Sequence, residues 1–238
     1  MTNQAALYTL ASTLCSYPQV EHLQELEALL PLLAQADDAL SAGLYQMLSQ
    51  WTEAHIVDLQ SDYIDLFDRG HAQNPIYETE YGRNRSISKT TELADLAGFY
   101  QAFGLMTEGL PEMQDHISVE LEFYAWLLLK SSYLESIADK EGIEIVQKAQ
   151  LAFLKQHLGG FSQSLPECTG VKEHPEYSLI FRWVSQLVKQ SCEHFEIEPD
   201  PVSFFTNQRE PEEFDCSTLG GCGVPAATAA EIPLPLRN

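Results

Sequence analysis

The sequence predicts an all-α fold, a single-domain helical bundle followed by an irregular C-terminal tail. Apolar residues recur at the i, i+3, i+4 and i+7 spacing of one helix face over most of the chain. No segment of any length alternates apolar and polar residues as a half-buried strand does. Breaks containing glycine or proline separate the periodic segments, so the pattern indicates a series of helices joined by short connections.

The first part of the chain is expected to form three helices. Apolar residues from 5 to 14 share one face of the first helix, which stops at Tyr17-Pro18 because proline lacks the backbone donor that a helix needs. The leucine-rich segment 22–33 predicts the second helix, and residues 40–51 predict the third. Each carries an apolar stripe that can face a common core.

A fourth helix is expected to carry an aromatic stripe and to end at a glycine. The stripe consists of Ile56, Leu59, Tyr63, Leu66 and Phe67. The helix is expected to end near Gly70, a natural C-cap. Residues 71–89 contain Asn74-Pro75 and few aliphatic side chains, which is typical of a loop.

The second half of the chain repeats this pattern. Helical spacing resumes at Thr91 and is closed by Gly104. After a break that ends in Pro111, the longest helix is expected from about residue 115 to residue 139. A further helix covers about 143–158 and ends at Gly159-Gly160, and the last runs from about 175 to 195.

The amino-acid composition changes near residue 199. Six prolines follow, at positions 199, 201, 211, 225, 233 and 235, together with the glycine-rich run 220–223. Such a composition does not support a packed element. We therefore expect a helical domain over 1–198 and a mostly irregular, acidic tail over 199–238.

The charge of the chain restricts its partners. It has 35 acidic and 13 basic residues, for a net charge of −22, and no Lys or Arg precedes Arg69. Such a surface repels nucleic-acid phosphates and anionic lipid, and it attracts cationic segments. The longest apolar run is too short to cross a membrane, so no membrane insertion is expected.

The termini and cysteines indicate a compartment. The N-terminus lacks the basic region and cleavage site of a secretory signal. The cysteines are odd in number and scattered, at positions 15, 168, 192, 216 and 222. Without an export signal, this predicts reduced thiols and a cytoplasmic protein.

Glu112, Asp115 and His116 stand at the start of the longest expected helix, with Glu120 one turn further on. Three interpretations are open. Asp115 can act as the N-cap, since its carboxylate can accept from a free first-turn amide. His116 and Glu120 could ligate a metal with a neighbouring acid, although one His with carboxylates is a thin ligand set. The junction could also be a binding hot spot.

The stretch from Tyr63 to Asp68 is a second candidate. Tyr63, Leu66 and Phe67 are spaced to share a helix face, so core packing is expected for Leu66 and Phe67, with the Tyr63 hydroxyl at the rim. Asp65 and Asp68 lie off that face. They could contact a cationic peptide or form part of a solvated acidic surface.

These segments occur in an order that resembles a known family. Tyr63-Ile64-Asp65-Leu66-Phe67 comes first, then 77–82 and 92–100, and then Glu112-Met113-Gln114-Asp115-His116 with its continuation to residue 123. Taken together over about 60–130, they resemble the TorD/NarJ-like family of molybdoenzyme maturation chaperones. The family usually has a proline after the Glu of the last motif, where this chain has Met113.

The resemblance implies a chaperone and not an enzyme. It implies a cytoplasmic protein that binds the N-terminal region of a molybdenum oxidoreductase catalytic subunit, often a twin-arginine leader. The chaperone holds the apoenzyme until the molybdenum cofactor is inserted. Contacts are expected at the loop 71–89 and the junction 109–116. The implied client-binding residues are Tyr63, Asp68, Glu112, Asp115, His116 and Glu120. No cofactor is expected for the chain itself. Family members can exchange helices between protomers, so a homodimer is compatible with the resemblance.

Two other function classes stay open from the residues. A small metal-dependent or redox enzyme would use His116, Glu120 and the tail cysteines Cys216 and Cys222. A helical adaptor would bind its partner equally well before and after cofactor loading. The sequence has no phosphate loop, dinucleotide fingerprint or Gly-x-Ser-x-Gly elbow, which favours the non-enzymatic classes.

Overall fold

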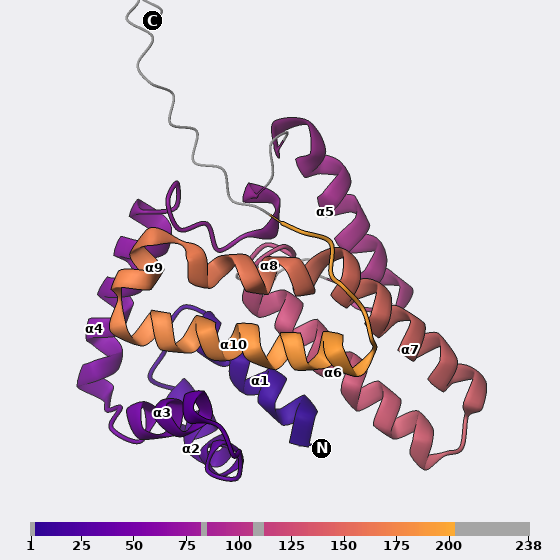
Figure 1. Ribbon diagram of the computed structural model, residues 1–238, viewed down its shortest axis with the longest axis horizontal. Coiled ribbons are helices and arrows are strands. Elements are labelled where there is room, and N and C mark those ends of the chain that lie inside the picture. The colour runs from indigo at the N-terminus through magenta and orange to yellow at the C-terminus, as the bar shows by residue number, and fades with distance from the viewer. Residues whose placement is uncertain (1–2, 82–84, 107–111, 203–238) are drawn as a thin grey trace, which may run out of the picture. The chain divides into compact units, whose positions relative to one another are not determined.

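The computed structural model describes residues 3–81, 85–106 and 112–202, with residues 85–88 described through their backbone alone (Figure 1). Its α-helices are α1 (Asn3–Cys15), α2 (His22–Leu33), α3 (Ala39–Leu48), α4 (Glu53–Tyr63), α5 (Arg85–Ala102), α6 (Ile117–Ser136), α7 (Lys140–Phe153), α8 (Gly159–Ser164), α9 (Thr169–Glu173) and α10 (Pro175–His194). Two π-helical turns, η1 (Ile64–Arg69) and η3 (Leu154–Leu158), and two 3-10 turns, η2 (Glu78–Glu80) and η4 (Leu165–Glu167), complete it.

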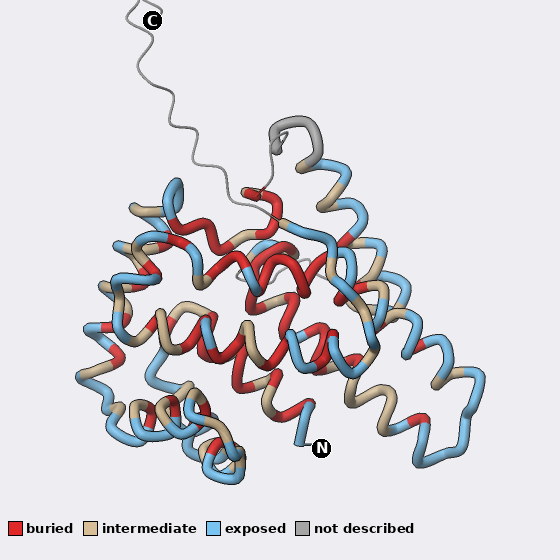
Figure 2. Tube along the Cα trace, in the orientation of Figure 1, coloured by how far each residue is buried: buried red, intermediate tan, exposed pale blue. Residues whose placement is uncertain are grey.

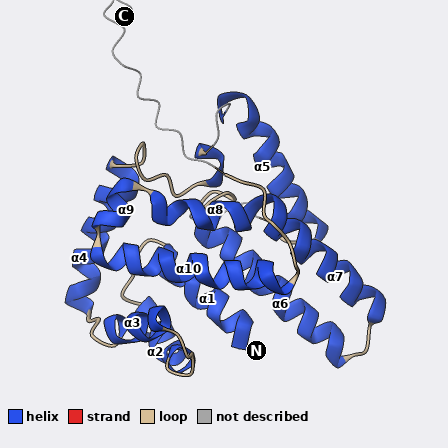
Figure 3. Ribbon diagram, in the orientation of Figure 1, coloured by secondary structure: helices blue, strands red, loops and turns tan. Residues whose placement is uncertain are grey.

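The predicted all-α class is confirmed. Within the described ranges there is no strand, and Tyr77 and His116 form an isolated antiparallel bridge (Figure 3). No helix in these ranges is both long and apolar enough to cross a membrane.

Helices α1, α6 and α10 form the centre of the bundle. Helix α1 packs against α2, α6 and α10, while α10 also contacts α3, α8 and α9. The largest fully buried side chains are Tyr8, Tyr124, Tyr177, Phe153, Phe161 and Phe181. Tyr8 links the central helices, because its ring lies 4.6 Å from that of Tyr124 and its hydroxyl donates to Ser191 Oγ at 2.7 Å. Burial is concentrated here, and the turn between α6 and α7 is exposed (Figure 2).

Side-chain caps fix the starts of several helices. Asp38 accepts from the Ser41 amide ahead of α3, and Thr52 accepts from the His55 amide ahead of α4. Asp139 does the same for α7. Each cap satisfies one backbone donor that the first turn would otherwise leave unpaired. Helices α3 and α7 begin close to the positions expected from apolar periodicity.

Two boundaries differ from the prediction. Helix α5 begins at Arg85 instead of Thr91. Gly159-Gly160 was expected to end a helix, yet the chain continues from η3 into α8 through both glycines. The physical reason is close packing: a Cβ on Gly160 would overlap the backbone carbonyl of Asp200.

Residues 199–202 lie along α8 as an extended segment. The Asp200 amide donates to the Lys155 carbonyl at 2.8 Å, and the Ser164 hydroxyl donates to the Val202 carbonyl at 2.5 Å. These contacts belong to residues that were expected in the tail. The division of the chain at residue 198 stays a prediction, since 203–238 lie outside the described residues.

A glycine-to-alanine pair tests this packing. Gly160→Ala should lower the free energy of unfolding by about 2 kcal/mol, because overpacking against a backbone forces the segment 199–202 to move. Gly98→Ala on α5 meets no atom within 4 Å, so it should raise stability by about 0.5–1 kcal/mol. Urea unfolding of both variants measures the difference, and equal stability changes would contradict the packing role.

Candidate functional site

Two segments far apart in sequence are joined at the start of α6. The Glu78 amide donates to the Asp115 carbonyl at 2.8 Å, and the Ile117 amide donates to the Ile76 carbonyl at 3.2 Å. These bonds flank the bridge between Tyr77 and His116. The predicted loop and the predicted junction are therefore in direct contact, and we call this contact the 77–116 junction.

Asn74 anchors the beginning of the loop. Its side-chain oxygen accepts from the amides of Gly170 at 2.8 Å and Val171 at 3.3 Å, and its amide group donates to the Leu66 carbonyl at 3.3 Å. The side chain is buried, at 4% exposure. One residue thus ties the loop to both η1 and α9, which holds the following residues against α6.

His116, not Asp115, is the N-cap of α6. Its Nδ1 accepts from the Ser118 amide at 3.2 Å, and the Ser118 Oγ lies 2.7 Å from the same nitrogen. A nitrogen that accepts an amide hydrogen carries no proton, so the ring hydrogen is on Nε2. The cap predicted at Asp115 is wrong by one residue because the carboxylate has another partner.

That partner is Thr79. Asp115 Oδ2 accepts from the Thr79 hydroxyl at 2.6 Å and from its backbone amide at 3.4 Å. Asp115 and Thr79 are both fully buried. The carboxylate therefore fixes the 3-10 turn η2 and does not cap the helix.

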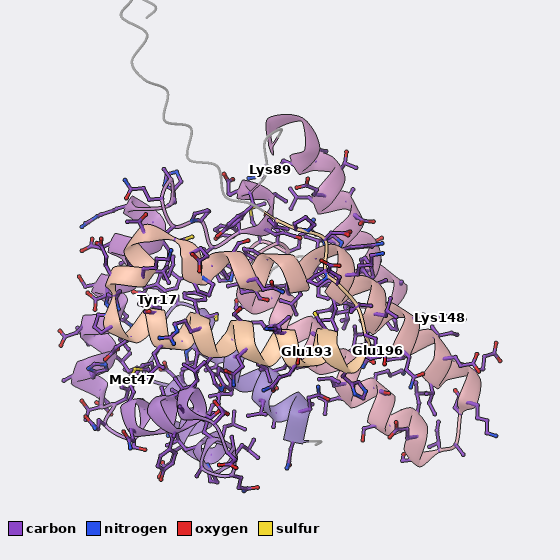
Figure 4. The ribbon with its side chains drawn as sticks, in the orientation of Figure 1. Tyr17, Met47, Lys89, Lys148, Glu193 and Glu196 are labelled. Carbon is purple, nitrogen blue, oxygen red and sulfur yellow. The ribbon has the colours of Figure 1, made fainter. Side chains whose placement is uncertain are left out.

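The second ring nitrogen of His116 reaches the aromatic motif. His116 Nε2 donates to the Tyr63 hydroxyl across 3.0 Å. Tyr63 ends α4, and its ring packs on Phe67 at 4.9 Å and on Tyr17 at 5.5 Å, the latter labelled in Figure 4. Burial lowers the pKa of His116 from 6.5 to about 3. Its neutral form, which makes both hydrogen bonds, therefore contributes full stability above pH 6.5 and loses it toward pH 3.

Tyr77 presents an acidic residue beside this arrangement. Its ring lies edge-on to His116 at 5.0 Å, and its hydroxyl donates to Glu112 Oε2 at 2.7 Å. Burial, the bond to Glu112 and the charges of Glu112, Asp115 and Asp68 raise the pKa of Tyr77. Glu112 and Asp68 are the two predicted site residues that solvent can reach, and Glu112 is held directly by the Tyr77 hydroxyl.

A buried ion pair joins Glu78 of η2 to His157 of η3. Glu78 Oε2 lies 3.0 Å from His157 Nδ1, and Asp95 lies 3.2 Å from His157 Nε2. Burial opposes the charge on His157, yet the two carboxylates raise its pKa above 6.5. Burial likewise raises the pKa of Glu78. Nearby, Lys89 pairs with Glu80 at 2.6 Å (Figure 4).

Glu120 is the most enclosed acid of the site. It is 0% exposed, and neither carboxyl oxygen has a hydrogen-bond partner in the described part of the chain. Burial raises its pKa, and the charges of Glu78 and Asp115 raise it further. Burial therefore favours the neutral, protonated form of this side chain over the carboxylate.

Most of the predicted site residues are buried in the structure and are not accessible to a partner. Tyr63, Asp115, His116 and Glu120 are buried, Glu112 is half-buried, and Asp68 is exposed. The buried four position the junction, so a rigid client could contact only Asp68 and Glu112 directly. Client binding by these six residues stays a prediction.

Three supporting residues were missed from the sequence. Thr79 holds the predicted acid Asp115, His157 pairs with Glu78 of η2, and Asn74 anchors the loop. Asn74 was noted only as a turn residue. His157 pairs with a residue 79 positions away, and no local pattern indicates such a contact.

The metal interpretation gains no support from the described residues. They contain no group of three or more His, Cys, Asp or Glu side chains placed to hold a metal ion. Cys15, Cys168 and Cys192 are free and buried. Cys216 and Cys222, which the enzyme hypothesis needs, lie outside the described ranges.

A double-mutant cycle tests the His116–Tyr63 contact. His116→Ala should cost about 3 kcal/mol of unfolding free energy, since it removes a cap and a buried hydrogen bond. Tyr63→Phe should cost about 1 kcal/mol, and the double variant should cost about 1 kcal/mol less than the sum. His116→Asn, which can still cap α6, should recover about 1 kcal/mol. Additive losses in urea unfolding would show that the two side chains do not interact.

The raised pKa of Glu120 predicts a pH dependence of stability. Its folded-state pKa is raised above 4.5, so the carboxyl lowers stability as pH rises above that value, while the unfolded chain ionises freely. The free energy of unfolding of Glu120→Gln, relative to that of the natural chain, should therefore rise by about 2 kcal/mol as pH increases from about 5 to about 8. Glu135→Gln, on the exposed part of α6, should differ in stability from the natural chain by the same amount throughout this pH range. Thermal unfolding across this range measures both, and a pH-independent effect of Glu120→Gln would contradict the buried neutral acid.

Comparison with known proteins identifies the family. The family model described as nitrate reductase delta subunit matches residues 30–165, which include the 77–116 junction. The chain is 31% identical over 144 residues to the selenate reductase assembly chaperone protein of Thauera selenatis, covering 57% of this chain and 70% of that one. It is 31% identical over 105 residues to the chlorate reductase assembly chaperone protein of Ideonella dechloratans, covering 43% and 53%.

A third relative is the nitrate reductase molybdenum cofactor assembly chaperone NarJ of Escherichia coli K12, 28% identical over 148 residues that cover 60% of each chain. The match thus spans less than two thirds of the chlorate reductase and nitrate reductase chaperones. The relatives are named as assembly chaperones and not as enzymes, which confirms the function class and the family predicted from the motifs. The chain belongs to the nitrate reductase delta subunit family of NarJ-type assembly chaperones.

Proposed function

We propose that this chain is a cytoplasmic maturation chaperone for one molybdenum oxidoreductase. It binds the N-terminal or leader region of the catalytic subunit and holds the apoenzyme until the molybdenum cofactor is inserted. One observation supports this above the others: the family match at 30–165 includes the whole 77–116 junction. The relatives are named for the assembly of selenate, chlorate and nitrate reductases.

The chemistry of the site is that of a binding surface. His116 caps α6 and His157 is paired with carboxylates, while burial favours the protonated form of Glu120 and Asp115 is hydrogen-bonded by Thr79. No described side chain of the junction combines exposure with the activated state that a nucleophile or general base needs. Asp68 and Glu112 instead offer negative charge beside an aromatic ring, which suits a basic, partly apolar peptide.

The charge of the chain supports the same partner. An excess of acidic residues steers a cationic segment toward the surface and makes its association sensitive to salt. A leader peptide offers arginines next to an apolar stretch. The chaperone would release the subunit after cofactor loading, and this distinguishes it from a passive adaptor.

The test is capture of the client from the native host. The tagged chain should co-purify with one molybdoenzyme catalytic subunit that contains little molybdenum, as measured by mass spectrometry and metal analysis. Growth on tungstate, which blocks formation of the molybdenum form, should increase the amount captured.

Two outcomes would contradict the proposal. Capture of fully loaded enzyme at the same level as apoenzyme would favour an adaptor. Capture of no such subunit, together with stoichiometric metal on the chain that His116→Ala removes, would favour the enzyme hypothesis.

A further inference from the structure

A groove of about 580 Å³ lies between α1, α2 and the beginning of α6. Its volume is within the range of ligand sites in proteins. It is lined by Thr9, Ser12, Thr13, Ser16, His22, Glu25, Ala28, Leu29, Glu112, Ser118, Val119 and Glu122. Glu112 and Ser118 place one end of the groove at the 77–116 junction, while the rest of its lining comes from residues outside the predicted site.

The hydroxyl groups that line the groove all donate their hydrogen to other groups of the protein. Thr9, Thr13 and Ser16 donate to backbone carbonyls of α1. Ser12 donates to the Ser118 carbonyl at 2.8 Å, which joins α1 to α6 in the groove. The Ser118 hydroxyl donates to the unprotonated Nδ1 of His116. Each hydroxyl has one hydrogen, so only lone pairs are left for a ligand.

The charged groups of the groove are also acceptors. Glu25, Glu112 and Glu122 have no Lys or Arg partner among the described residues. This differs from Glu80 and Glu167, which pair with lysines. His22 adds no fixed positive charge, because burial lowers its pKa. The groove therefore combines uncompensated negative charge with a wall that accepts hydrogen bonds.

An arginine side chain matches this surface. Guanidinium has five N–H donors, no acceptor and a permanent positive charge, whereas an ammonium group is a compact point charge with three donors. The aliphatic part of the side chain can lie on Ala28, Leu29 and Val119. We propose that the α1–α2–α6 groove binds an arginine of the client's N-terminal segment. This inference rests on the proposed chaperone function and adds a location and a side-chain preference to it.

The direct test uses a defined probe and two matched double variants. The probe is a fluorescein-labelled peptide with two arginines and four leucines, made also with lysine or with uncharged citrulline in place of arginine. Glu25→Gln with Glu122→Gln removes two charges from the groove. Glu27→Gln with Glu144→Gln removes two exposed charges elsewhere. Glu27 is also on α2, but two residues from Glu25 and so on the opposite side of the helix.

Fluorescence anisotropy at about 150 mM salt measures the affinities. The groove variant should bind the arginine peptide about tenfold more weakly than the natural chain, and the control variant less than about twofold more weakly. The natural chain should prefer arginine over lysine by about fivefold or more, with citrulline weakest. Unchanged thermal unfolding confirms that both variants are folded.

Each contrary result has its own meaning. Equal weakening in both double variants would assign binding to the overall acidic charge and overturn the groove. Equal affinity for arginine and lysine would overturn the donor-matching argument, as would the absence of measurable binding. If the groove variant still captures the apo-subunit as well as the natural chain, the groove inference fails and the chaperone function stands. If the natural chain captures no molybdoenzyme subunit but keeps its arginine preference, the chaperone function fails instead.

Discussion

The candidate site depends on one neutral, fully buried imidazole. His116 caps α6 through Nδ1, bonds to Tyr63 at the end of α4 through Nε2, and pairs through its backbone with Tyr77. Nδ1 must accept and Nε2 must donate, so protonation of the ring would break the cap. Burial lowers the pKa of His116 and so favours its neutral form. The neutral ring and its backbone connect three separate segments of the chain.

Around this histidine the chain buries three acids, and each is accommodated by a different physical means. Asp115 is hydrogen-bonded by Thr79, Glu78 is paired with His157, and burial favours the protonated form of Glu120. A buried carboxylate without a partner would be strongly destabilising. Asp68 and Glu112 have no such restriction, because solvent reaches them. The site thus separates into an interior of enclosed acids and a rim of acids that solvent reaches, and only the rim is accessible to a basic client.

Apolar periodicity was enough to predict the long helices, because burial of a helix face repeats every three to four residues, but it did not predict the short helices α8 and α9. It failed at Gly160, where close approach of Asp200 and not a helix end explains the glycine. It also placed the α6 cap on Asp115, since Asp is the usual capping residue and the partner of Asp115 is 36 positions away. Long-range pairs such as Glu78 with His157 are made by the tertiary fold and have no local signal.

The buried motif residues are therefore not themselves the surface that would bind a client. Hydrogen bonds connect the motif to that surface. Tyr77 holds Glu112 at the rim, and His116 fixes the direction of the Ser118 hydroxyl. If His116 were protonated, the Ser118 hydroxyl would turn and present its hydrogen to the groove. The groove would then lose part of its acceptor character. The buried motif thus determines how the Ser118 hydroxyl faces the groove, while Glu25 and Glu122, which lie outside the motif, supply carboxylates to its lining.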